Sequence, residues 1–216
     1  MKRDLFPTLK RLRGQDDDGL VGLEIDADSV AAVQVDANGN AQLAAGAVAP
    51  LAAGAVSDGE VADQDAVAEA LRSLFATHDL PHRVRLGIGN QRVVVRTLRL
   101  PAIENPKELA TAVHFAAQEQ IPMPIDEAVL DHRVVGGAPA TEAATPQLDV
   151  VVVAARRAMI TAWLETLRKA GLQPAGIDLS AFGLIRAMGD LSEPEGEEAP
   201  SRPTTSVVYS NVGEVT

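Results

Sequence analysis

The stretch VGLEIDADSV at residues 21–30 decides the fold predicted for this chain. It is an apolar, β-branched run that breaks at acidic and small residues and continues through Ser29 into a second apolar run. The stretch VVYSNVGEVT at residues 207–216, at the end of the sequence, has a similar form. A strand, a tight turn and a hydroxyl side chain together place N–H and O–H groups where they can cradle a phosphate. The two stretches therefore predict a pair of phosphate-binding elements.

The residues expected to line these elements are Glu24, Asp26, Ala27, Asp28 and Ser29 in the first and Asn211 and Gly213 in the second. An alternative interpretation makes Glu24, Asp26 and Asp28 solvent-facing residues of an ordinary hairpin. Both interpretations stay open at the level of the sequence.

Composition narrows the class of protein. The chain has 216 residues, of which 46% are apolar, and this is enough for one sizeable core or two small ones. Its net charge of -11 argues against nucleic-acid binding, which relies on Lys and Arg to neutralise phosphates. The sequence contains no cysteine, no apolar run of membrane-spanning length and no signal-peptide pattern. We therefore expect a cytoplasmic protein.

Residues 1–19 form a tail that is basic and then acidic. If the first part is helical, Leu5, Leu9 and Leu12 share one face beside five basic residues, Lys2, Arg3, Lys10, Arg11 and Arg13. Such a segment can lie on an anionic membrane surface. The alternative is a disordered terminus with solvated charges, which is favoured because chain ends are commonly poorly ordered.

Strands and helices alternate after the tail. Residues 20–25, 30–35 and 41–48 predict an antiparallel meander with an Asn38-Gly39 turn, followed by a helix over 65–77 and a strand over 84–88. This part, residues 20–91, is expected to be the core of a first lobe.

Residues 92–179 predict an inserted α+β subdomain. Its strands are expected at 93–98, 129–135, 148–154 and 177–179. The first helix, over 106–120, has a complete start with Asn105 as N-cap, Pro106 at N1 and Glu108 at N3. The second helix carries an apolar stripe around Trp163 and ends at Gly171. A helix and an acidic, Pro-rich loop then fill 180–205, and 206–216 begin a second lobe.

Side chains that carry chemistry are scattered. The pair Arg156 and Arg157 could receive an anion, although a solvated pair at a helix start is the commoner case. Gly87 and Gly89 lack the third glycine and the following helix of a dinucleotide fingerprint. No Ser-His-acid or Cys-His set can be assembled, and the four histidines stand apart. The sequence therefore predicts no catalytic residue and no metal site.

Several motifs carry a family resemblance. They are VGLEI at 21–25 with SVAAV at 29–33, LRLP at 98–101, IPMPIDE at 121–127, GLQPAGID at 171–178 and NVG at 211–213. Together with the order of elements, they resemble the PilM family of type IV pilus assembly proteins, in the FtsA-like branch of the actin-like ATPase superfold. The resemblance covers most of residues 20–216.

The resemblance implies an α/β fold, an actin-like and ribonuclease-H-like first lobe with an inserted α+β subdomain, truncated as the second lobe begins. It also implies a cytoplasmic protein, peripheral to the inner membrane, that binds the N-terminal tail of a PilN-like membrane protein and contacts other pilus platform or motor components. Some members bind ATP with Mg.

Departures from the family pattern bear on ATP. The first element usually reads Asp-Ile-Gly, with a Lys farther on, whereas this chain has Glu24, Ile25 and Asp26, with Ala31 at the Lys position. A carboxylate at Asp26 would repel a phosphate. Asn211 replaces an Asp and cannot give Mg a charged oxygen ligand. Both elements therefore look degenerate.

Three functions remain open. An adaptor would use a groove between the first lobe and the insert to hold an extended peptide. An ATPase or sugar-kinase relative would need both phosphate elements and a second lobe. A division protein like FtsA would anchor to the membrane through a C-terminal amphipathic helix, which this sequence does not contain. The adaptor is the favoured interpretation.

Overall fold

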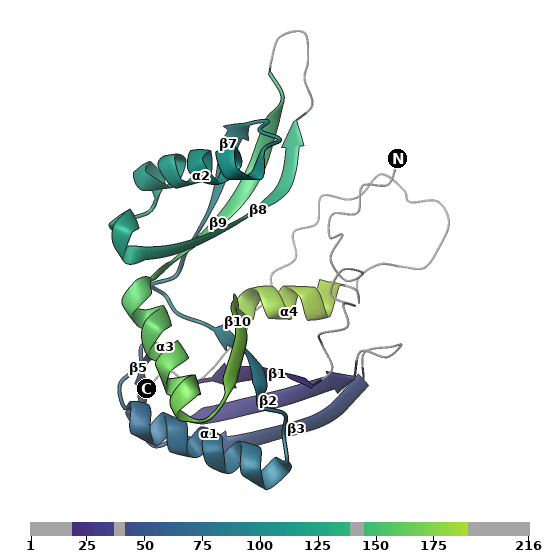
Figure 1. The fold of residues 1–216 in the computed structure, drawn as a ribbon, viewed down its shortest axis with the longest axis vertical. Coiled ribbons are helices and arrows are strands. Elements are labelled where there is room, and N and C mark those ends of the chain that lie inside the picture. Colours follow the sequence, from purple (N-terminus) through teal and green to yellow (C-terminus); the bar gives the residue numbers. More distant parts are fainter. Residues whose placement is uncertain (1–18, 37–41, 139–144, 190–216) are drawn as a thin grey trace.

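The computed structural model describes residues 19–36, 42–138 and 145–189. They form two units that meet at the upper end of α3 (Arg157–Lys169), as Figure 1 shows. Several expected features lie outside the described residues: residues 1–18 of the tail, the Asn38-Gly39 turn, the acidic loop and the second phosphate element with Asn211 and Gly213.

The first unit is built on a five-stranded sheet. Its strands, in spatial order, are β10 (Gln173–Leu179), β6 (Arg83–Ile88), β1 (Leu20–Ile25), β2 (Ser29–Asp36) and β3 (Gln42–Pro50). The first three strands of the chain pair antiparallel, which confirms the predicted meander. Strand β6 runs parallel to β1, and β10 runs parallel to β6, so these three strands end at the same edge of the sheet.

Helices cover one face of this sheet and part of the other. α1 (Gln64–His78) and α3 contact each other and bury their apolar sides against the face that carries Leu23 and Leu86. Trp163 of α3 is 2% exposed in this core. α4 (Ser180–Gly189) contacts β6 and β10 on the other face of the sheet. Gly87 of β6 is on that same face and lies against the start of α4.

A small hairpin joins the meander to α1. β4 (Val56–Ser57) and β5 (Glu60–Val61) pair antiparallel around Asp58 and Gly59, both of which have positive φ. An Asp-Gly pair is a preferred two-residue hairpin turn because both positions accept that backbone conformation. The Arg92 guanidinium donates to the Glu60 carboxylate at 2.7 Å, which ties the hairpin to the segment leading into the second unit.

The start of α1 is fixed by side chains. The Asp63 carboxylate accepts hydrogen bonds from the backbone N–H groups of Asp65 and Ala66, which would otherwise lack partners. The Lys169 ammonium, at the end of α3, donates to Asp65 and holds the pKa of that carboxyl below its usual range. The end of α3 is thereby joined to the start of α1.

The second unit is a three-stranded antiparallel sheet covered by one long helix. Its elements are β7 (Val94–Pro101), α2 (Pro106–Gln120), the short 3-10 helix η1 (Ile125–Glu127), β8 (Ala128–Ala138) and β9 (Gln147–Arg156), with β9 in the centre. The predicted start of α2 is confirmed: the Asn105 side chain accepts from the Lys107 N–H, and Pro106 is the first helical residue. Val113 and Ala117 pack with Val150 and Val152 in a separate core.

The second unit ends earlier than the sequence predicts. The expected insert over 92–179 includes α3 and β10, but β10 pairs with β6 in the first sheet. α3 likewise buries Trp163 and Leu167 in the first core. An apolar helix face does not reveal which sheet it will cover, so the sequence pattern put α3 in the wrong unit. By strand pairing, the insert is residues 94–156.

The turn at Gly171, after α3, directs the chain back toward the first sheet. Gly171 has φ +82°, and its N–H donates to the Arg168 carbonyl, while the Leu172 N–H donates to the Leu167 carbonyl. This pair of bonds is the Schellman arrangement that ends many helices at a left-handed glycine. It leads directly into β10.

A pair of glycine substitutions tests this turn. Gly171→Ala should lower the free energy of unfolding by about 1 kcal/mol, because an L side chain disfavours positive φ. Gly183→Ala, in the middle of α4 with open space around its Cα, should instead raise it by roughly 0.5–1 kcal/mol. Urea denaturation of both variants measures the two shifts. Equal shifts of the same sign would contradict the assigned turn.

Candidate functional site

The first predicted phosphate element is the short loop between β1 and β2. It follows the end of β1, and the side chains of Glu24, Asp26 and Asp28 are all exposed there. Ala27 and Ser29 are half-buried. The five predicted residues of this element therefore lie close together, with Glu24 near the end of β1, Asp26 to Asp28 in the turn and Ser29 at the start of β2.

The carboxylates of this turn accept hydrogen bonds from N–H and O–H groups of the same turn. Asp26 accepts the Ala27 N–H at 3.0 Å, and Asp28 accepts the Ser29 hydroxyl at 2.8 Å. The Asp26 N–H donates to the Ser29 carbonyl, which closes the turn. A phosphate would have to displace a carboxylate to reach the Ala27 N–H or the Ser29 O–H. These N–H and O–H donors of the turn are therefore already hydrogen-bonded within it, and they are not free to bind an anion.

A further acidic residue lies at the same edge. In the sheet register, Glu24 is opposite Gly87, and Gly87 is opposite Asp178, so these residues share one face of three adjacent strands. Asp178 accepts the Leu179 N–H at 2.8 Å and forms an ion pair with Arg186 of α4. Asp178 is the last residue of the GLQPAGID motif, but it is not among the residues predicted for the site. An acidic residue at the carboxyl end of a strand was the available signal.

Gly87 lets α4 start close to the sheet. A Cβ at this position would lie 2.9 Å from the Ser180 hydroxyl oxygen, which is too close. That oxygen is buried and has no hydrogen-bond partner in the described structure. The first turn of α4 is thus pressed against β6, and Asp178 and Arg186 flank it.

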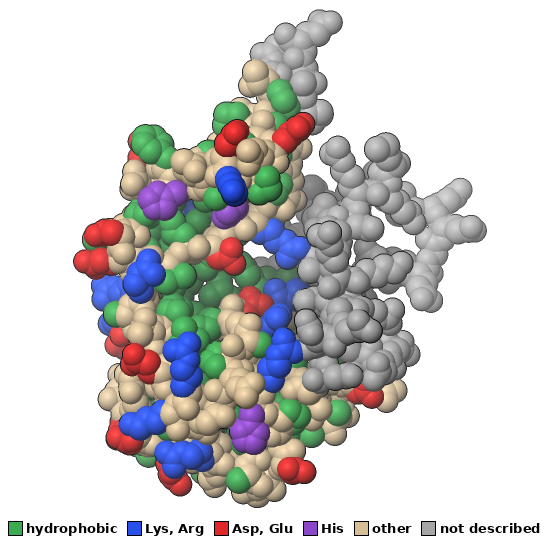
Figure 2. Space-filling model, viewed as in Figure 1, with side chains coloured by type: hydrophobic (Ala, Val, Ile, Leu, Met, Phe, Trp, Pro, Cys, Tyr) green, Lys and Arg blue, Asp and Glu red, His purple; other side chains and the backbone are tan. Residues whose placement is uncertain are grey.

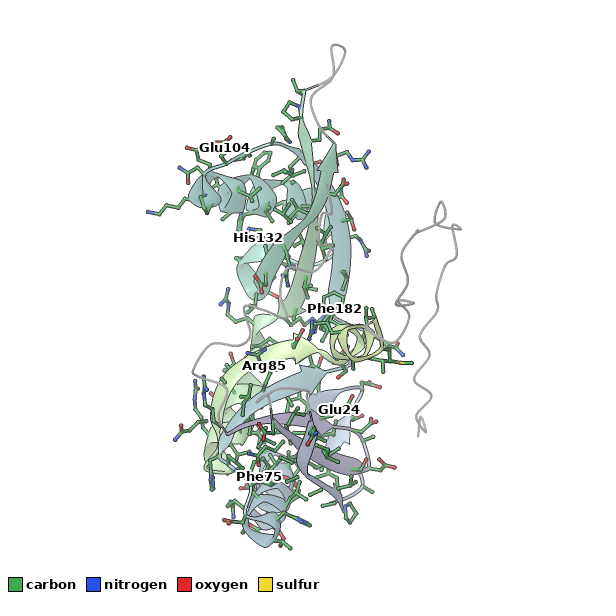
Figure 3. The ribbon with its side chains drawn as sticks, turned by 90° about the vertical axis from the view of Figure 1, so that its right-hand side faces the viewer. Glu24, Phe75, Arg85, Glu104, His132 and Phe182 are labelled. Carbon is green, nitrogen blue, oxygen red and sulfur yellow. The ribbon has the colours of Figure 1, made fainter. Side chains whose placement is uncertain are left out.

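The surface is hollowed between the two units. Figure 2 shows this hollow at mid-height, with hydrophobic side chains on its floor and charged side chains of both signs around it. Figure 3 shows Phe182 of α4 at the level where the two units meet, with Arg85 of β6 below it and His132 of β8 above it. All three side chains are half-buried. Strand β8 is an edge strand and has no further strand beside it among the described residues.

A separate groove lies on the insert. Leu100 of β7 and Ala112, Phe115 and Ala116 of α2 line it. Phe115 is 71% exposed there. The described residues contain no group of three or more His, Cys, Asp or Glu side chains placed to hold a metal ion. No helix in the described part of the chain is long and apolar enough to cross a membrane.

Sequence and structural matches to known proteins cover both units. The family described as type IV pilus assembly protein PilM matches residues 22–202. A solved structure described as a PilM-PilN type IV pilus biogenesis complex aligns with a TM-score of 0.71 and 31% identity, over 80% of this chain and 51% of that chain. This chain therefore spans about half the length of that relative.

A more distant match is a Bacteroides thetaiotaomicron VPI-5482 protein, described as having an actin-like ATPase fold and unknown function. It aligns with a TM-score of 0.37 and 12% identity, over 80% of this chain and 56% of that chain. This similarity is too low to bear on function.

The PilM match agrees with the architecture. The five-stranded sheet with its meander is the expected α/β first lobe, and a small α+β unit is inserted into it. The family match includes both units and the motifs LRLP and IPMPIDE. The chain belongs to the type IV pilus assembly protein PilM family.

Proposed function

We propose that this chain is an adaptor of the type IV pilus inner-membrane platform that binds the N-terminal tail of a PilN-like membrane protein. Membership of the PilM family already implies a role in pilus assembly. The relative that aligns at 31% identity is described as a PilM-PilN complex, which supports a partner of the PilN kind for this chain as well.

The hollow between the two units is the observation that carries this proposal. An extended peptide gains affinity from backbone hydrogen bonds to a free sheet edge and from apolar pockets for alternate side chains. Strand β8 offers such an edge, and Phe182 offers an apolar surface at the level of the hollow (Figure 3). Ordering the free peptide offsets part of this contact energy, so we expect micromolar affinity.

The partner also accounts for the proposed location. The described part of the chain has no helix able to span a membrane. Binding the tail of an inner-membrane protein would hold this chain at the cytoplasmic face of that membrane. Other pilus platform or motor components could then contact the surfaces that the tail leaves open.

An ATPase role has weaker support. The Ala27 N–H and the Ser29 O–H are engaged by carboxylates of the same turn, and exposed carboxylates line the edge where phosphates would lie. We propose that the site is degenerate and that this chain performs no catalysis. ATP and Mg remain candidates only for a longer form that supplies a second lobe.

Substitution of two phenylalanines tests the peptide groove. Phe182→Ser should weaken binding of the tail at least about tenfold, because a buried aromatic contact contributes more than 1.4 kcal/mol, the equivalent of that factor. Phe115→Ser, on the exposed side of the insert, should leave binding unchanged. Calorimetric titration with the tail of the PilN-like protein from the same genome measures both values.

Thermal melting of each variant first establishes that it is folded. Loss of binding in the Phe115 variant alone would move the partner to the groove on α2. No heat with the unmodified chain, together with no rise in its melting temperature, would contradict the adaptor proposal itself.

ATP binding is a separate prediction. The unmodified chain should bind ATP with a dissociation constant above about 10 μM, which corresponds to less than roughly 7 kcal/mol. Asp26→Gly should raise the affinity by about tenfold, because it removes a repelling charge and frees the Ala27 N–H. Fluorescence titration with a labelled ATP analogue measures both. Tight binding by the unmodified chain would instead favour an ATPase.

A further inference from the structure

The insert is joined to the first unit by two chain crossings. Residues 89–93 lead from β6 into β7, and β9 passes directly into α3 between Arg156 and Arg157, with no loop. Both crossings lie beside the first turn of α3 (Figure 1), where the Asn90 side-chain amide donates to the Met159 sulfur at 3.3 Å. Movement between two units is absorbed by a few loop or end-of-element residues, so the tilt of the insert depends on how firmly these crossings are held.

The second crossing is held by an arginine at the start of α3. The Arg157 guanidinium donates to the backbone carbonyl of Ala128 at 2.8 Å. Ala128 is the first residue of β8, and it pairs with Arg156 at the end of β9. Arg157 therefore joins α3 directly to β8, the strand whose edge we propose as part of the tail site.

The first crossing is in contact with the β4–β5 hairpin of the first unit. This hairpin is anchored, because Ala55 and Val56 are buried in the first core and β5 contacts α3. Its tip lies against the crossing: a Cβ at Gly59 would be 3.0 Å from the Gly89 carbonyl oxygen. A firmly held part of the first unit thus reaches the segment that leads into the insert.

Arg92 ties this segment to the hairpin. Its guanidinium donates to the Glu60 carboxylate at 2.7 Å and lies 3.8 Å from the Asp58 carboxylate. The backbone N–H of Arg92 donates to the Asn90 side chain at 2.7 Å, and the Val93 N–H donates to the Asn90 carbonyl at 3.1 Å. The first crossing is therefore closed into a turn and paired by charge with the first unit.

We propose that Arg92 is a positioning residue, whose ion pairs with the β4–β5 hairpin fix the tilt of the insert and so set the width of the hollow. The hollow has β8 on the insert side and Phe182 on the side of the first unit (Figure 3), so a tilt of the insert changes their separation. The apparent affinity of a site falls with the fraction of molecules that hold it in the binding geometry. This consequence for affinity rests on the proposed binding of the tail.

The ion pair should act on geometry more than on stability. The Arg92 side chain is 46% exposed and that of Glu60 is 33% exposed, and ion pairs with such access to water contribute little to the free energy of unfolding. A matched control lies inside the insert, where Arg99 of β7 and Asp149 of β9 pair at 3.0 Å. This second pair is also partly exposed, but it does not join the two units.

Two spin labels measure the tilt, since the chain has no cysteine of its own. Ser73→Cys on α1 and Ala110→Cys on α2 place one label on each unit at exposed positions. In the labelled chain, Arg92→Gln should broaden the distribution of label distances measured by pulsed electron paramagnetic resonance. Arg99→Gln should leave the distribution unchanged. Arg92→Lys, which keeps a positive charge beside Glu60, should largely restore it.

Calorimetric titration with the tail of the PilN-like protein gives the second readout. Arg92→Gln should raise the dissociation constant about fivefold, the lower end of typical couplings between distinct sites, and Arg99→Gln should not change it. Glu60→Gln should act like Arg92→Gln, and the double variant should show no larger effect, because both changes break the same pair. The melting temperatures of the Arg92 and Arg99 variants should be similar.

The two readouts separate this proposal from the adaptor proposal, because the label distances are measured without the tail. If the unmodified chain binds no tail, the adaptor proposal fails, and the label distances alone decide whether Arg92 fixes the tilt. An unchanged distribution in the Arg92→Gln variant, or equal broadening in the Arg99→Gln variant, would overturn the proposal. A broadened distribution with unchanged tail affinity would also overturn it, because Arg92 would then not position the site.

Discussion

The pairing of β10 with β6 is the constraint on which the structure depends. β6 precedes the insert in the sequence, and β10 follows it. Their pairing returns the chain to the first sheet, which therefore contains strands from both sides of the insert. The Schellman turn at Gly171 and the ion pair between Lys169 and Asp65 hold the approach to this strand. The hollow between the units and the position of α4 both follow from this return.

The same pairing collects acidic groups at one edge of the sheet. Glu24 and Asp178 lie on either side of Gly87, and Asp26 and Asp28 extend the acidic surface beyond β1. Arg186 neutralises Asp178, while Asp26 and Asp28 accept hydrogen bonds from their own turn. The hydrogen-bonding groups of the Asp26–Asp28 turn are therefore occupied by its own carboxylates, which supports the proposed adaptor role over phosphate binding.

Local signals in the sequence predicted most of the elements but not their assembly. The start of α2 at Asn105 and the meander were predictable because caps and alternating patterns are local. The partner sheet of α3 was not, because its apolar stripe suits either core. Asp178 and Gly87 become neighbours only when β10 pairs with β6, and the direction of the Asp26 carboxylate depends on the folded turn. The β4–β5 hairpin was predictable as well, because Asp58-Gly59 is a local turn signal, although it is absent from the predicted elements.

Amide chemical-shift mapping with the tail of a PilN-like protein tests the central claim most directly. The account predicts that the largest changes fall on β8 and on the first turn of α4 around Phe182, on both sides of the hollow. Changes confined to the loop of Asp26 and Asp28, to the α2 surface around Phe115, or to no residue at all would contradict it.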